Sequence, residues 1–178
     1  MVALLLASGF EEIEALTPLD ALRRVGLTVD SIGITGKRVT GGHGITVIAD
    51  KLIDEVDASD YDTVILPGGL LGTENIDKCP FTDEIIGSVL ERGGRVAAIC
   101  AAPTVLGKRG LLKGKRAVCY PGMEDELVGA FTSTEGVVTD GQITTARGMG
   151  VALPFSLELV RLLVSDDAAR ALSESIVQ

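Results

Sequence analysis

The 178-residue sequence contains no tryptophan, two tyrosines, four phenylalanines and a single histidine, His43. So few aromatic side chains argue against a surface on which nucleic-acid bases stack. The net charge of −9 argues the same way, because binding to phosphates requires cations. We therefore expect no nucleic-acid partner.

Cysteine and long hydrophobic runs are scarce as well. The three cysteines, Cys79, Cys100 and Cys119, form no disulfide framework and, with one histidine, no zinc pattern, so we expect free thiols and no metal site. The run from Met1 to Ala7 is too short to cross a bilayer. Because the first cation is Arg23, the start of the chain also lacks the basic leader of a signal peptide. Together with free thiols, these absences predict a cytoplasmic protein with no membrane partner.

What the sequence does contain is an alternation of short apolar runs and helical patterns, which predicts a mostly parallel sheet with helices on both faces. Strands are expected at residues 2–7, 28–34, 62–69, 95–99 and 116–120, and two β-rich runs flank a turn at 139–142. Helices are expected at residues 11–25, 82–92, 103–109, 151–164 and 166–176. Pro18 should kink or restart the first helix, and residues 38–50 indicate a hairpin-like excursion. Without repeats or linkers, residues 1–178 are expected to form one α/β sandwich domain.

Three of these strands end in loops with unusual residues. The first strand is followed by "SGFEEIE", the third by "LPGG", and the fourth by Cys100. Because the carboxyl ends of parallel strands hold the ligand site in an open α/β sheet, we expect the three loops to meet at one edge.

Cys100 stands on a sharp turn from a strand into a helix, the arrangement of a nucleophile elbow. The N-terminus of the following helix should lower the pKa of the thiol. The small Ala101 and Ala102 let the backbone approach closely. The alternative is a buried structural cysteine.

Other candidate site residues flank this turn. The amides of Gly68, Gly69 and Ala101 could form an oxyanion hole, although Pro-Gly-Gly also suits a plain turn. Glu14 lies inside the first helix beside apolar residues, where burial would raise its pKa and let it donate a proton to a thiolate. His43, in a glycine turn, is expected to be solvated. The segment "RGMGVAL" lacks the third glycine of a dinucleotide site.

Five segments carry a resemblance to a known family. They are "LLLASGFEEIEAL", "DALRRVGL", "YDTVILPGGLLGTENI", "GRVAAICAAPTVL" and "ITTARGMGVALPFSLELV". In these segments, and in their order, the chain resembles the ThiJ/PfpI superfamily, specifically the ThiJ branch containing the parkinsonism-associated protein deglycase. The resemblance implies a flavodoxin-like three-layer sandwich, related to class I glutamine amidotransferases, that usually forms a homodimer.

The resemblance also implies a chemistry. Cys100 would be the reactive, oxidation-sensitive cysteine and Glu14 its acid, with amides from Gly69 and Ala101 and with Arg24 as a secondary anion-binding residue. The implied activity is a cofactor-free conversion of α-oxoaldehydes to hydroxy acids, or repair of glyoxal-modified amines and thiols. Chaperone activity and sensing of oxidative stress are also ascribed to the family.

One position departs from the family pattern. Tyr120 stands where members active on glyoxals generally carry a histidine, and a phenol with a pKa of about 10 is a poor base near neutrality. Two hypotheses therefore remain open: a glyoxalase or deglycase in which Tyr120 assists, and a redox-sensing chaperone in which Cys100 is oxidised and turnover is low. A third is a structural dimer with an incidental thiol.

Overall fold

A computed structural model describes residues 1–178 of the chain. Its centre is a seven-stranded sheet in the order β10-β11-β7-β6-β1-β2-β5. The strands are β1 (Val2–Leu6), β2 (Val29–Gly33), β5 (Lys51–Leu52), β6 (Thr63–Leu66), β7 (Arg95–Ile99), β10 (Val137–Asp140) and β11 (Ile143–Ala146). All neighbours are parallel except β10 and β11, which form the hairpin expected around residues 139–142. The predicted α/β class is confirmed.

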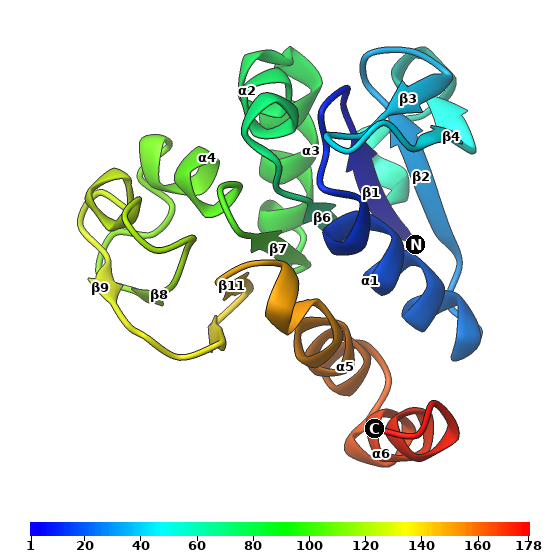
Figure 1. Ribbon diagram of the computed structural model, residues 1–178. Helices are drawn as coiled ribbons and strands as arrows, with labels where there is room; N and C mark the ends of the chain where they lie inside the picture. The colour runs from blue at the N-terminus through cyan, green and yellow to red at the C-terminus, as the bar shows by residue number, and fades with distance from the viewer.

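Helices cover both faces of this sheet (Figure 1). One face carries α1 (Glu12–Arg24) and α5 (Ala152–Leu163), with α6 (Asp166–Ser175) packed on α5. The other carries α2 (Leu70–Lys78), α3 (Pro80–Glu91) and α4 (Pro103–Lys108). Alternate residues of a strand enter opposite cores: Leu4 and Leu6 pack toward α1 and α5, and Leu5 packs toward α2 and α3. The result is the three-layer sandwich that the sequence predicts.

Smaller elements lie at the edges of the layers. A hairpin of β3 (Arg38–Thr40) and β4 (Thr46–Ile48) confirms the excursion expected within residues 38–50. A second small sheet pairs β8 (Arg116–Ala117) with β9 (Phe131–Thr132). Short 3-10 turns are η1 (Ile53–Glu55), η2 (Ala58–Asp60), η3 (Glu124–Glu126) and η4 (Met149–Val151). None of the helices has the length and apolar composition needed to cross a membrane.

Three details differ from the sequence prediction. Helix α1 continues through Pro18, which is buried on its core face, so of the two predicted effects, a kink or a restart, the restart does not occur. The strand expected at residues 116–120 stops at Ala117, because the chain then turns toward the end of β7. Helix α2 was not predicted, since only a few residues of its short segment are buried.

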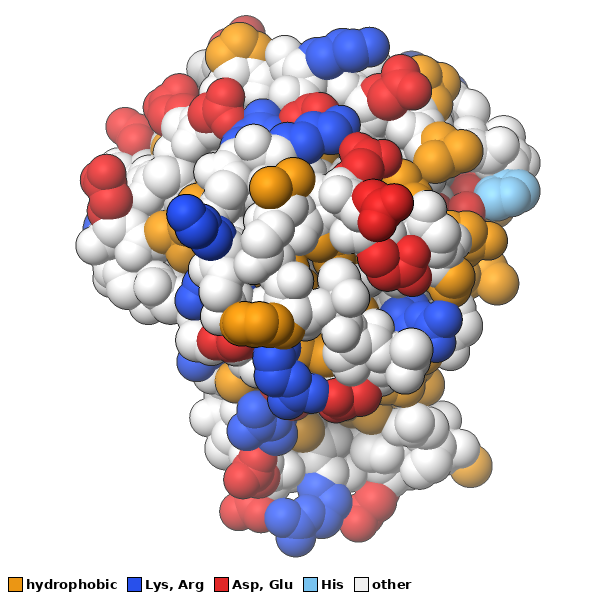
Figure 2. All heavy atoms as spheres, turned by 90° about the vertical axis from the view of Figure 1, so that its left-hand side faces the viewer, with side chains coloured by type: hydrophobic (Ala, Val, Ile, Leu, Met, Phe, Trp, Pro, Cys, Tyr) orange, Lys and Arg blue, Asp and Glu red, His pale blue; other side chains and the backbone are white.

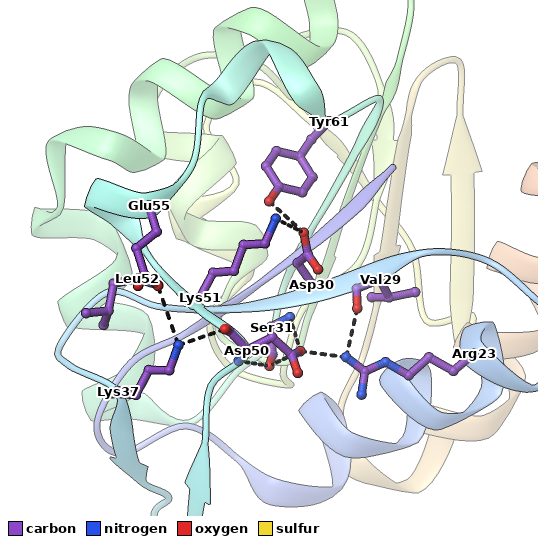
Figure 3. Close-up of polar contacts among 10 residues, drawn as sticks. All are labelled: Arg23, Val29, Asp30, Ser31, Lys37, Asp50, Lys51, Leu52, Glu55 and Tyr61. Atoms are coloured by element: carbon purple, nitrogen blue, oxygen red, sulfur yellow. Dashed lines mark hydrogen bonds and ion pairs between the residues drawn. The ribbon is translucent and has the colours of Figure 1, made fainter.

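A partly buried polar network stabilises the β2–β5 edge of the sheet (Figure 3). The fully buried Tyr61 donates its hydroxyl to Asp30 at 2.9 Å, and Lys51 pairs with the same carboxylate at 3.0 Å. Close by, Asp50 accepts from the amide of Ser31 at 2.8 Å and its hydroxyl at 2.6 Å, and pairs with Arg23. Burial and the Asp30 carboxylate both raise the pKa of Tyr61, so the phenol remains a hydrogen-bond donor.

We expect Tyr61→Phe to destabilise the protein by about 1–2 kcal/mol, because it removes a buried hydrogen bond to a charged acceptor without opening a cavity. The free energy of unfolding from urea titration measures the effect. A change within about 0.5 kcal/mol, the range of an ordinary surface substitution, would contradict this role for the hydroxyl.

Candidate functional site

The three loops that follow β1, β6 and β7 meet at one edge of the sheet, as predicted from the strand pattern. These strands are neighbours in the sheet and all run parallel. Hydrogen bonds join the loop after β1 to the loop after β6 and to α2: the Glu11 amide donates to the Gly68 carbonyl at 3.0 Å, and the Gly72 amide donates to the Gly9 carbonyl at 3.1 Å. The buried sheet therefore presents the loop residues on a fixed frame.

Cys100 stands at the end of β7 with a left-handed backbone, at a φ of 65°. A non-glycine residue pays roughly 1–2 kcal/mol for this conformation. Two long-range backbone hydrogen bonds hold it: the Cys100 amide donates to Ala146 at 2.9 Å, and its carbonyl accepts from Tyr120 at 2.7 Å. A strained residue held in place at a strand end is typical of a functional position. It supports the nucleophile-elbow hypothesis over the alternative of a buried structural cysteine.

Glu14 lies directly beneath this turn. It is 1% exposed, and its carboxylate accepts a hydrogen bond from the Gly68 amide at 3.1 Å. Position 68 has no room for a side chain, since a Cβ there would lie 2.6 Å from the Cβ of Cys100 and closer still to the Glu14 carboxylate. The absence of a side chain at Gly68 therefore lets the acid and the thiol come together.

Gly148 marks the point where three predicted site residues converge. A Cβ at this position would lie 3.5 Å from the Tyr120 ring, 3.7 Å from Oε1 of Glu14 and 3.9 Å from Sγ of Cys100. In the sequence, Gly148 stands in the rejected dinucleotide pattern and in one of the five segments that carry the family resemblance, and neither gives it this role. Only the contact between segments distant in the chain shows it.

The site opens to solvent through a pocket of about 250 Å³. Its walls are formed by Glu11, Gly69, Leu70, Cys100, Ala101, Tyr120 and Met123. Leu70 and Met123, which the sequence did not suggest, supply apolar walls at the mouth. The pocket has room for a small molecule bearing a carbonyl group next to the sulfur.

Comparison with known proteins identifies the family. A model of the DJ-1/PfpI family matches residues 1–162. The chain belongs to the DJ-1/PfpI family. Protein dj-1beta of Drosophila melanogaster is 34% identical over 97% of this chain and 94% of its own. A deglycase of Pyrococcus abyssi is 33% identical over 91% of this chain and 98% of its own. The structure of oxidized Toxoplasma gondii DJ-1 superposes with a TM-score of 0.94, at 32% identity, covering 99% of this chain and 97% of that one.

The two titratable groups at the centre of this site, Glu14 and Cys100, both have raised pKa values. Burial raises the pKa of Glu14 to about 7, an effect that the nearby Glu11 charge reinforces, so near neutrality the carboxyl exists in both protonation states. Burial, followed by the Glu14 carboxylate, raises the pKa of the Cys100 thiol to about 12, although the Gly69 and Ala101 amides oppose the shift.

The lowered thiol pKa expected from the sequence is therefore wrong for the state in which Glu14 is ionised. Helix α4 has only six residues and begins at Pro103, so its dipole is too weak to outweigh burial and a neighbouring carboxylate. When Glu14 is protonated, the repulsion disappears and its hydroxyl can donate to the sulfur. The thiolate form of Cys100 is thus favoured when Glu14 carries a proton and disfavoured when Glu14 is ionised.

The structure does not bring Arg24 to the site of its own chain. Arg24 ends α1, where it pairs with Asp20 at 2.6 Å and lines a hollow beside α6. Ten residues of helix, about 15 Å, separate it from Glu14. Binding of anions across a dimer interface remains a prediction.

His43 is closer to the site than expected. Its ring is 69% exposed, yet Nδ1 lies 2.9 Å from Glu12 and 3.5 Å from Glu11, a residue of the pocket wall. These three side chains place possible metal ligands within 4.8 Å of one another. However, Glu12 already accepts hydrogen bonds from the amides of His43 and Ile45 and from the His43 ring. These bonds attach the β3–β4 hairpin to α1, and they leave no free pair of carboxylates to bind an ion.

We expect Glu14→Gln to accelerate alkylation of Cys100 above about pH 7 far more than Glu11→Gln does. The substitution removes the carboxylate that opposes thiolate formation and keeps a hydrogen-bond donor beside the sulfur. Mass spectrometry after iodoacetamide treatment over a pH series measures the rate, with Cys79 of the same chain as internal reference. Equal effects of the two substitutions would refute the pairing of Glu14 with Cys100.

Proposed function

We propose that the protein is a cysteine-dependent, cofactor-free enzyme of the glyoxalase or deglycase type. Its substrates would be α-oxoaldehydes such as methylglyoxal, or the adducts that they form with amines and thiols. The observation that carries the proposal is the strained Cys100, held against the buried Glu14 at the floor of an open pocket. We further propose that residues 1–178 act as one domain.

The reaction begins when Sγ of Cys100, as thiolate, adds to the aldehyde carbon and forms a hemithioacetal. The amides of Gly69 and Ala101, which face the sulfur, stabilise the oxyanion that develops on the aldehyde oxygen. Glu14, which carries a proton when Cys100 is a thiolate, first gives that proton to the ketone oxygen. Its carboxylate then removes the proton from the aldehyde carbon and delivers it to the adjacent carbon. The former aldehyde carbon is thereby oxidised to a thioester and the ketone reduced to an alcohol, and water releases the hydroxy acid and the thiol.

Glu14 suits this role because its pKa of about 7 allows it to accept and to return a proton near neutral pH. Tyr120 lies where it can orient the substrate or assist a proton transfer, since its ring faces Gly148 and lines the pocket. The deglycase of Pyrococcus abyssi, similar over nearly its whole length, lends further support.

The second candidate is a redox-sensing chaperone. The tyrosine at position 120, a poor base near neutrality, favours low turnover. In this role an oxidant such as a peroxide would convert the thiolate stepwise to sulfenic and then sulfinic acid, with Glu14 and the two amides stabilising the product. All three cysteines are free thiols, as such a sensor in a reducing cytoplasm would require.

A second copy of this chain is the proposed protein partner. Ile13 on α1 is 48% exposed, and Ile45 and Ile48 in the adjoining hairpin are 54% and 65% exposed. The Ile45 amide bonds to Glu12 at 3.4 Å, so the hairpin lies against the first turn of α1, the helix that carries Ile13. Grouped exposed aliphatic residues of this kind mark contact surfaces.

We expect the wild-type protein to convert methylglyoxal to lactate and Cys100→Ser to lose at least about 100-fold in rate, because a serine hydroxyl is far less acidic than a thiol. Tyr120→His should raise the rate, since imidazole is the better base near neutrality. Lactate is quantified by chromatography on the same preparations.

Two results together would refute the proposed enzyme activity and support the redox sensor. They are the absence of lactate with both the wild-type protein and the Tyr120→His variant, and rapid formation of Cys100 sulfinic acid in peroxide. Lactate formation that survives in Cys100→Ser would refute the proposed nucleophile.

We expect the protein to be a dimer in solution and Ile48→Asp to weaken it, because the substitution places a charge within an apolar contact. Light scattering after size-exclusion chromatography gives the mass of each form. A monomeric wild-type protein, or a dimer unaffected by Ile48→Asp, would show that this face is not the contact surface.

A further inference from the structure

The hairpin of β3 and β4 is fastened to the loop that begins α1. The Gly9 amide donates to Thr40 and the Gly42 amide donates to Phe10, both at 2.8 Å. At the tip, the 3% exposed Glu12 accepts the His43 amide at 2.8 Å. The hairpin therefore moves with the first turn of α1, and its tip has a fixed position relative to the pocket wall.

His43 adds a titratable group to this contact. In Figure 2 the single histidine, in pale blue, projects from the right-hand edge of the surface with acidic atoms directly beside it. The groups that face its ring are Glu12, at 2.9 Å, and Glu11, at 3.5 Å. The hydrogen bond to Glu12 and the charges of both acids raise the pKa of His43 from its ordinary value of 6.5.

Glu11 connects this contact with the reacting residues. Its side chain lines the Cys100 pocket, and its amide is bonded to Gly68, whose own amide binds Glu14. The negative charge of Glu11 contributes to the raised pKa of Glu14. A change of charge beside Glu11 is therefore felt at the Glu14–Cys100 pair.

We propose that His43 is a positioning residue that regulates the Cys100 site through Glu11: its positive charge offsets that of Glu11 and so favours the thiolate of Cys100. This inference rests on the proposed function, in which Cys100 reacts as a thiolate.

The sign of the effect follows from the charges. Below the raised pKa of His43 the ring is positive, and it lowers the negative potential that Glu11 creates at Glu14 and the sulfur. As the pH rises through this pKa the positive charge is lost, and both reacting groups then bind their protons more tightly. The His43 contact thus favours reaction at lower pH and ceases to assist at higher pH.

The test is the rate of Cys100 alkylation by iodoacetamide across a pH series for the wild-type, His43→Gln and His43→Lys proteins. We expect His43→Gln to react about threefold more slowly near pH 6.5, and at the wild-type rate once the pH is well above the raised pKa of His43. His43→Lys keeps a positive charge and should retain the faster rate across the range. In about 1 M salt, where the screening length is about 3 Å, the difference should shrink.

A double-mutant cycle separates this charge effect from a loosened hairpin. In a Glu11→Gln background, His43→Gln should change the rate by less than about 1.5-fold, because the charge that His43 offsets is gone. A purely structural role would give the same loss in both backgrounds. Arg38→Gln is the matched control, since it removes an exposed positive charge from the same hairpin and should leave the rate unchanged.

The outcomes distinguish this inference from the function on which it rests. Equal pH profiles of wild-type and His43→Gln, with Cys100 reactive in both, would overturn the role of His43 alone. A Cys100 that is not alkylated at any pH would overturn the thiolate chemistry and this inference with it. An effect of His43→Gln that persists unchanged in the Glu11→Gln background would also overturn it.

Discussion

The site depends on one backbone conformation, the left-handed Cys100 between β7 and α4. Its amide and carbonyl form hydrogen bonds with Ala146 and Tyr120, so segments that lie far apart in the chain hold the strained conformation in place. The same bond from Tyr120 draws the chain away from β8 and places the tyrosine ring in the pocket wall. One constraint thus sets the direction of the thiol and assembles the opposite wall of the site.

Around this residue the protein arranges opposing electrostatic effects. Burial places a carboxyl and a thiol side by side, which makes two negative charges unfavourable and ties each thiolate to a proton on Glu14. The amides of Gly69 and Ala101 act in the opposite direction. Burial and the carboxylate outweigh the amides, and the charge of Glu11 adds to their effect. A change at Glu11, or at His43 beside it on the surface, can therefore alter the reactivity of the sulfur.

The sheet makes such fine control of geometry possible. Strands β1, β6 and β7 lie in its middle, buried on both faces by separate apolar cores. Their loops therefore have fixed origins, while the elements that complete the site, η4 and the segment after β8, come from the less regular end of the chain. Rigid strands with variable loops are a common basis for function in α/β proteins.

The sequence by itself determined the order of strands and helices, the meeting of three strand ends, and the candidate pair of Cys100 and Glu14. Each follows from local patterns: apolar periodicity, a thiol at a strand-to-helix turn, and an acid among apolar neighbours. Only the tertiary structure decided the convergence at Gly148, the path that brings Tyr120 to the site, the docking of His43, the distance of Arg24 and the raised thiol pKa. These features arise from contacts and burial between residues far apart in the chain, which no local pattern encodes.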